Sequence, residues 1–127
     1  MKIRILGNSL RFRLGRSEVQ AFGITRIVEE RVSFGPRPQI DFCYRLETTP
    51  GNEFLGSFVD GIITVRVPET LVNHWVQSEQ VSLEGNQKLD EKTNLHFLIE
   101  KDFVCLNAHN DEDQSDRFPH PKGDPAC

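Results

Sequence analysis

Apolar and polar residues alternate along much of this chain, and the clearest example lies within residues 61–85. Ile63, Val65 and Val67 fall on one face of an extended segment, because successive side chains of a strand point to opposite sides. Pro68 has no amide hydrogen to donate, so it ends this strand and suits the first turn of a helix. The pattern therefore predicts a strand followed directly by a helix.

The residues after this proline predict a short helix that docks on a sheet. Apolar side chains recur on one side of it, at Leu71, Val72, Trp75 and Val76. A helix of about two to three turns does not persist alone in water, so this side must pack against other elements. A second strand is predicted over residues 81–84.

An earlier part of the chain repeats this unit at residue numbers lower by 53. Residues 10–22 align with 63–75, and residues 42–47 align with 95–100. A further match of 32–34 with 81–83, at a shift of 49, predicts that the second copy is four residues shorter after its helix. We interpret the pattern as an internal duplication of a strand–strand–helix–strand–strand unit.

This interpretation predicts a mainly β protein with two short α-helices. Two similar ββαββ halves, about residues 2–47 and 55–100, would form a small closed or partly open barrel with a pseudo-two-fold axis. Residues 1–106 would then be a single domain. Gly15 and Gly23 are expected to begin and end the first helix.

The length of 127 residues suits one domain, but the net charge of −4 conceals a split. Residues 1–45 carry nine lysines or arginines against four acids, whereas residues 46–127 carry six against fifteen. Such a split indicates an ionic partner or two halves that face each other. The three cysteines are odd in number and widely spaced, which argues against a disulfide framework.

No apolar run approaches the roughly 20 residues of a membrane span. The N-terminal residues open directly into an alternating strand and lack the apolar middle of a signal peptide. We therefore expect a cytoplasmic protein with no membrane contact.

The sharpest charge feature is a hairpin predicted over residues 2–14. One of its faces carries four cations: Lys2, Arg4, Arg11 and Arg13. They could form a solvated face, pair with acids of the second half, or bind an anion, since clustered arginines take carboxylate or phosphate in a bidentate manner. The acidic total argues against nucleic acid, whose binding domains are usually basic. The partner that this face predicts is a protein or a small acidic ligand.

Residues 107–127 form an acidic tail with almost no aliphatic side chain, which we expect to be mobile. This segment and the residue positions just before it hold metal-capable groups, namely Cys105, His109, Asp111, Asp113, Asp116 and His120. Their spacing matches neither a structural zinc site nor a calcium loop. The alternatives are a solvated tail, a segment docked over the basic hairpin through Phe118 and neighbouring prolines, and a metal or catalytic site.

No residue set matches a recognised catalytic site, and no cofactor is indicated. The chain has no phosphate-binding glycine loop and no Gly-x-Ser-x-Gly elbow. His74 and His96 have no evident acid or nucleophile partner, and Cys43 is best explained as a small structural thiol. A non-enzymatic role is therefore favoured.

The strand that ends in Val67, Pro68 and Glu69, with the helix and strand that follow, resembles the half-unit of AbrB-like swapped-hairpin and double-psi barrels. The whole chain resembles a family of short bacterial proteins with no assigned function. The residues that carry this resemblance are Lys2–Ile5, Asn8–Ser9, Ser17–Val19, Val65–Pro68, Glu100–Phe103, Cys105–Leu106, Glu112–Asp113, Asp116, Phe118–Pro119 and Pro121. Neither resemblance implies a catalytic residue.

These observations lead to three hypotheses of function. The first is a small non-enzymatic binding module that uses the basic face of the N-terminal hairpin. The second is a metal-binding or metal-dependent protein that uses the Cys/His/Asp-rich C-terminal segment. The third is a transcriptional regulator, by analogy with the AbrB-like barrels.

Overall fold

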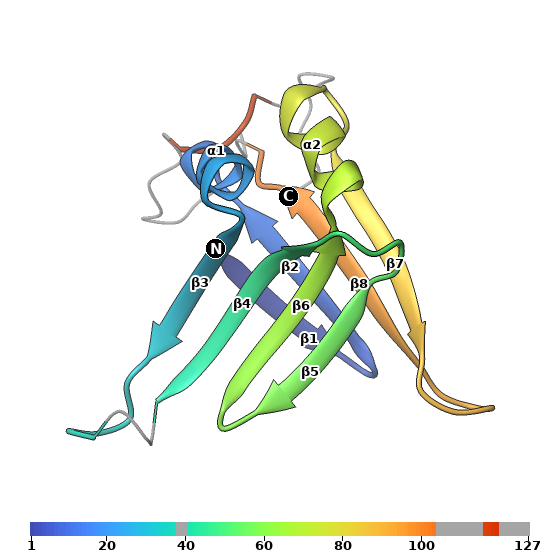
Figure 1. The fold of residues 1–127 in the computed structure, drawn as a ribbon. Helices are drawn as coiled ribbons and strands as arrows, with labels where there is room; N and C mark the ends of the chain where they lie inside the picture. Colours follow the sequence, from blue (N-terminus) through green and yellow to red (C-terminus); the bar gives the residue numbers. More distant parts are fainter. Residues whose placement is uncertain (38–40, 104–115, 120–127) are drawn as a thin grey trace.

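The computed structural model describes residues 1–37, 41–103 and 116–119 (Figure 1). These residues form two four-stranded sheets and two helices. Sheet A has the order β1-β2-β8-β7 and sheet B the order β3-β4-β6-β5. The strands are β1 (Lys2–Leu6), β2 (Ser9–Leu14), β3 (Ile27–Val32), β4 (Phe42–Thr49), β5 (Leu55–Val59), β6 (Ile62–Pro68), β7 (Ser82–Lys88) and β8 (Asn94–Lys101). The helices are α1 (Arg16–Thr25) and α2 (Glu69–Gln77).

Each half of the chain supplies one hairpin to each sheet. The first half gives hairpin β1–β2 to sheet A and β3–β4 to sheet B, while the second gives β7–β8 and β5–β6. The hairpins meet at parallel central pairs, β2 with β8 and β4 with β6. The prediction of a mainly β protein with two helices and two similar halves is confirmed. The sheets do not close into a barrel, because no ladder joins the edge strands of one sheet to those of the other in the described ranges.

The strand register shows which positions of the two halves are equivalent. Ile3 lies opposite Phe12 in the first half, and Gly56 lies opposite Val65 in the second, which is the shift of 53. The strands after the helices are offset differently from our alignment. Val28 pairs with Leu46 and Leu83 pairs with Ile99, a shift of 55, so the second half is two residues longer there and not four shorter. The earlier match failed because short apolar alternation does not fix a register.

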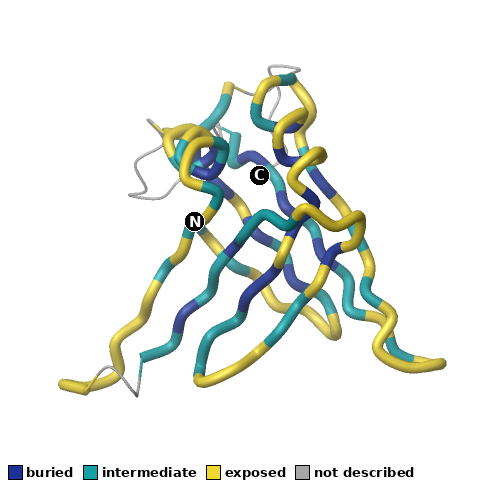
Figure 2. Tube along the Cα trace, viewed as in Figure 1, coloured by how far each residue is buried: buried dark blue, intermediate teal, exposed yellow. Residues whose placement is uncertain are grey.

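The core fills the space between the inner faces of the sheets and is closed at one end by the helices (Figure 2). Phe22 of α1 and Trp75 of α2 occupy equivalent positions, and both are fully buried. The indole Nε1 of Trp75 donates a hydrogen bond to the Val81 carbonyl at 3.0 Å, so its one polar atom is satisfied. Of the predicted apolar stripe of α2, Val72 and Trp75 are buried, whereas Leu71 is exposed.

Helix α1 is longer than predicted. Gly23 lies inside the helix, and the left-handed residue at its end is Arg26, with φ 66°. A Cβ at Gly23 would lie 2.9 Å from the side chain of Val76, so this glycine permits close contact with α2. The prediction that Gly23 ends the helix is wrong, because its role is to admit the neighbouring helix.

Residues 116–119 pack where α1 begins. The Asp116 carboxylate accepts hydrogen bonds from the Ser17 amide at 3.0 Å and the Ser17 hydroxyl at 2.8 Å, and so caps the helix N-terminus. These bonds, led by the one from the Ser17 amide, lower the pKa of Asp116. Phe118 contacts Phe103 and lies over the buried ammonium of Lys101. The expectation of a mobile tail otherwise falls outside the described residues and stays a prediction.

Lys101 is the one charged residue of the described part that is buried. Its ammonium donates to the Ser78 carbonyl at the end of α2, at 2.7 Å, and also lies 5.6 Å from the centre of the Trp75 ring. Burial lowers the pKa of Lys101, because charge is costly away from water. Lys101 thus ties the end of α2 to sheet A.

Neither helix among the described residues is long and apolar enough to cross a membrane.

Candidate functional site: the basic face of hairpin β1–β2

The four predicted cations lie together on the outer face of sheet A. Ile3 and Phe12 point into the core, so the alternate positions of β1 and β2 point outward. The register sets Lys2 opposite Arg13 and Arg4 opposite Arg11. We call these four residues the basic face; the structure brings all of them together as the sequence predicted.

Two acids at the end of β8 neutralise part of this charge. Glu100 lies 2.7 Å from the Nε of Arg13 and 3.5 Å from the Nε of Arg11. Asp102 lies 3.5 Å from the Nζ of Lys2 and 3.5 Å from the Nε of Arg117. The pairing of the first half's cations with acids of the second half, one of the alternatives, is therefore present at three of the four positions.

Arg4 is the exception within the described ranges, where no acid pairs with it. It is exposed and lies directly opposite Arg11, an arrangement in which like charges repel. Two shallow hollows flank these arginines, and both are lined by Arg4 and Arg11. One, of about 210 Å³, lies toward Lys2 and Arg13, and the other, of about 150 Å³, lies toward His96. The arginines thus line a surface that could receive an anionic group from either side.

Sheet B shows which parts of this face the fold itself requires. The pair Arg13–Glu100 has its equivalent in Arg66–Glu47, at 3.4 Å. The other three cations of the basic face have no charged equivalents. Their counterparts are Leu55 for Lys2, Ser57 for Arg4 and Thr64 for Arg11. The same strand arrangement therefore forms without them.

His96 has an acid partner that sequence analysis missed. Its Nε2 lies 2.6 Å from Glu84 on the neighbouring strand β7. The equivalent contact in sheet B joins the Cys43 thiol to Glu29 at 3.6 Å. Burial, and next the charge of Glu29, raise the pKa of Cys43, so this thiol stays protonated and inert. Cross-strand pairing brings these partners together, and no local spacing signals it.

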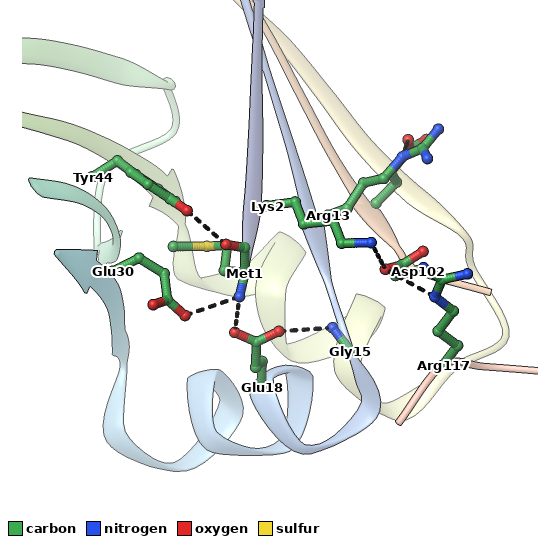
Figure 3. Close-up of polar contacts among 10 residues, drawn as sticks. Met1, Lys2, Arg13, Gly15, Glu18, Glu30, Tyr44, Asp102 and Arg117 are labelled. Atoms are coloured by element: carbon green, nitrogen blue, oxygen red, sulfur yellow. Dashed lines mark hydrogen bonds and ion pairs between the residues drawn. The ribbon is translucent and has the colours of Figure 1, made fainter. Parts of the chain in front are cut away.

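A second polar cluster adjoins the base of the hairpin (Figure 3). The Met1 amino group binds the carboxylates of Glu18 and, at 3.0 Å, Glu30, while the Tyr44 hydroxyl donates to the Met1 carbonyl at 2.7 Å. Burial alone would lower the pKa of the Met1 amine, but the bonds to Glu18 and Glu30 outweigh it and raise this pKa. The pKa of Tyr44 is raised by burial, and then by Glu30 and Glu18. The cluster joins the start of β1 to α1, β3 and β4, so we assign it a structural role.

The predicted metal-capable residues fall largely outside the described residues. Asp116 is the one of them that is described, and it caps α1. Within the described ranges no group of three or more His, Cys, Asp or Glu side chains could hold a metal ion. His74 is exposed on α2. The metal hypothesis for Cys105, His109, Asp111, Asp113 and His120 stays a prediction.

Comparison with known proteins identifies the family of this chain. A model of a family of unknown function, DUF7009, matches residues 1–122. The chain belongs to this family. No curated protein and no solved structure matches the chain. The predicted membership of an uncharacterised family is thus confirmed, while a bacterial origin and the resemblance to AbrB-like barrels stay predictions.

Proposed function

We propose that this protein is a non-enzymatic binding module that holds an acidic partner on the basic face of hairpin β1–β2. The observation that carries the proposal is the direct opposition of Arg4 and Arg11, with no acid on Arg4 in the described part of the chain. An anion that lies between two arginines at the surface removes their mutual repulsion, so its binding lowers the free energy of the pair.

The equivalent positions of sheet B support this role. There, Ser57 and Thr64 stand where sheet A carries Arg4 and Arg11. Because the two hairpins have the same register, the arginines are not needed to form the strand pair. Charges that the fold does not require, gathered on one exposed face, are typical of a surface that binds charged partners.

The chemistry of the face favours carboxylates or phosphates. Guanidinium groups present donors in a planar fork that matches both. The hollows beside Arg4 and Arg11 are shallow, about 150 and 210 Å³, so they suit single acidic groups better than an enclosed substrate. The net charge of −4 disfavours the binding of long nucleic acids, which are themselves highly negative. We therefore favour an acidic protein segment as the partner.

The test replaces the two arginines by the residues that sheet B carries at the same positions. The double variant Arg4→Ser, Arg11→Thr should bind a fluorescein-labelled oligoglutamate peptide at least about tenfold more weakly at low salt. A tenfold rise in Kd corresponds to a loss of about 1.4 kcal/mol of binding free energy. Fluorescence anisotropy measures this, with inorganic pyrophosphate as a small competitor. Binding by the unaltered protein should weaken as salt is added.

The matched control is Arg45→Ser on the outer face of sheet B. Arg45 is paired with Glu29 at 2.8 Å, so its removal takes away one positive charge from a neutralised position, against two in the double variant. We expect the control to retain peptide binding within about twofold, since paired surface charge contributes little. Equal binding by the double variant and the unaltered protein, or equal losses in the double variant and the control, would overturn the proposal.

A further inference from the structure

An apolar pocket of about 440 Å³ lies between the two sheets, at the end of the molecule opposite the helices. It is separate from the basic face, because the large apolar residues of its walls point inward from both sheets. The residues that line it are Ile5, Leu10, Phe42, Gly56, Ser57, Phe58, Ile63 and Leu95. Six of them lie beside the four hairpin turns, which Figure 1 shows at the end away from α1 and α2.

These six residues are three pairs of equivalent positions. Leu10 and Ile63 are equivalent, as are Phe42 and Leu95, and Ile5 and Phe58. Each half of the chain therefore contributes one member of every pair, and the pocket lies on the pseudo-two-fold axis. The shape of the pocket is therefore set by strands of both halves that pack on the core, and not by a single loop.

The spacing of the sheets beside the pocket is set by a glycine. A Cβ at Gly56 would lie 2.9 Å from the Phe97 ring and 3.0 Å from the Leu95 side chain. The backbone of β5 therefore packs directly on the side chains of β8, and the Gly56 amide also donates to Gln87 of β7 at 2.8 Å. Contacts between the two sheets thus hold the walls in place without a ligand, as in most small-molecule sites.

The two ends of the space between the sheets are covered differently. Phe22 and Trp75 close one end and are fully buried. At the other end Phe58 is 68% exposed and Ile5 is 58% exposed, and no described residue covers them. Large apolar side chains that gather around a hollow and stay in contact with water are typical of a binding site.

The lining decides the chemistry of the occupant. No charged residue lines the pocket, and its one polar residue is Ser57, whose position on β5 is equivalent to that of Arg4 on the outer face of sheet A. A charged group placed there would lose its water without gaining a partner, so the occupant must be uncharged inside the pocket. The volume lies within the roughly 300–1,000 Å³ that is usual for small-molecule sites. A second copy of the chain would need a protruding apolar side chain to fill a hollow of this size.

We propose that this pocket binds a small uncharged apolar molecule, held between the paired residues of the two halves. The proposal concerns the inner faces of the sheets and does not depend on the acidic partner of the basic face. The double variant Arg4→Ser, Arg11→Thr should therefore leave it intact.

The experiment titrates the protein with N-phenyl-1-naphthylamine, a neutral dye whose fluorescence rises in apolar surroundings. We expect saturable binding of one dye per chain. Phe58→Ser removes part of the wall and should weaken binding about tenfold, which corresponds to about 1.4 kcal/mol. Ile5→Trp places a bulky side chain in the pocket and should also displace the dye. Both side chains are largely exposed, so circular dichroism should show an unchanged fold.

The matched control is Phe34→Ser. Phe34 is 70% exposed, as Phe58 is, but it does not line the pocket. It should retain full dye binding. Equal losses in both serine variants, or dye binding that does not saturate, would overturn the proposal. A third outcome would also overturn it. If sedimentation showed a dimer that Phe58→Ser dissociates, and if no variant changed dye binding, the pocket would be an interface between two copies of the chain.

Discussion

The outer faces of the two sheets share a backbone plan and differ in how their charges are arranged. On sheet B the cations of the central strands lie beside acids of the same sheet: Arg45 contacts Glu29 and Glu47, and Arg66 contacts Glu47. The short contact from Arg45 also lowers the pKa of Glu29. On sheet A the cations gather on β1 and β2, and Leu98 stands on β8 at the position equivalent to Arg45.

This difference separates the charges that both sheets share from the charges that are particular to one sheet. The ion pair Arg13–Glu100 and its equivalent Arg66–Glu47 occur on both faces, which indicates a structural role. Each face also carries cations that have no equivalent on the other face. Arg45 on sheet B is paired with acids, whereas Arg4 and Arg11 on sheet A lie opposite each other. The inner faces and helices of the two halves are therefore alike, and the outer faces of the two sheets differ.

The largest effect on stability is expected for the two equivalent aromatic side chains that the helices bury in the core. Phe22→Ala and Trp75→Ala should each lower the free energy of unfolding by about 3–5 kcal/mol, because each leaves a cavity in the core. Trp75→Ala should cost more, since it also leaves the Val81 carbonyl without its indole donor. Urea unfolding measures both.

The control for these variants is Ile24→Ala on α1. Ile24 is 81% exposed, so the change should stay within about 0.5 kcal/mol. If Phe22→Ala behaved like this control while Trp75→Ala did not, the two helices would not have equivalent roles.

A smaller effect is expected where the halves differ, at the start of α1. Asp116→Ala removes the carboxylate that caps this helix and should cost about 1 kcal/mol at neutral pH. The folded protein holds the pKa of Asp116 below its ordinary value of 3.8. The stabilisation is therefore present above that ordinary value and is lost as pH falls through the lowered folded value.

Chemical unfolding at several pH values measures this dependence. The difference between the unaltered protein and Asp116→Ala should shrink in acid. Glu91→Ala, which removes an exposed acid of the β7–β8 turn, should leave the acid dependence unchanged. A difference that stays constant down to strongly acidic pH would show that the carboxylate of Asp116 does not cap the helix.

The smallest effect concerns the stability of the basic face itself. The double variant Arg4→Ser, Arg11→Thr relieves a like-charge pair and should raise the free energy of unfolding by about 0.5 kcal/mol. Arg45→Ser should lower it by a similar amount, about 0.5 kcal/mol, because it breaks contacts with two acids. Thermal unfolding of both variants measures the contrast. A clear loss of stability in the double variant would mean that the arginines serve the fold.

Sequence patterns predicted the elements better than their partners. The strands and helices were predictable because alternation and Pro68 are local signals, and the shift of 53 identified Phe22 and Trp75 as equivalent. The shift of 49 after the helices was wrong, since a short apolar run fits more than one register. Gly23 was misread because its function depends on Val76 of the other helix.

The candidate sites show the same limit. The four cations of the basic face were predictable from alternation within a single hairpin. Their partners Glu100 and Asp102 were not, because β8 joins β2 only through a parallel pairing between distant segments. The apolar pocket was also missed, since each of its six large apolar residues reads as an ordinary core position until the register places them in pairs.

The sequence by itself determined the elements, the repeated plan and the composition of the basic face, because each depends on periodicity within a short segment. The tertiary structure decided that the hairpins of the two halves interleave in two sheets, which acids neutralise which cations, and that a hollow remains at the end away from the helices. These features depend on which segments become neighbours, and burial of the whole core selects those neighbours.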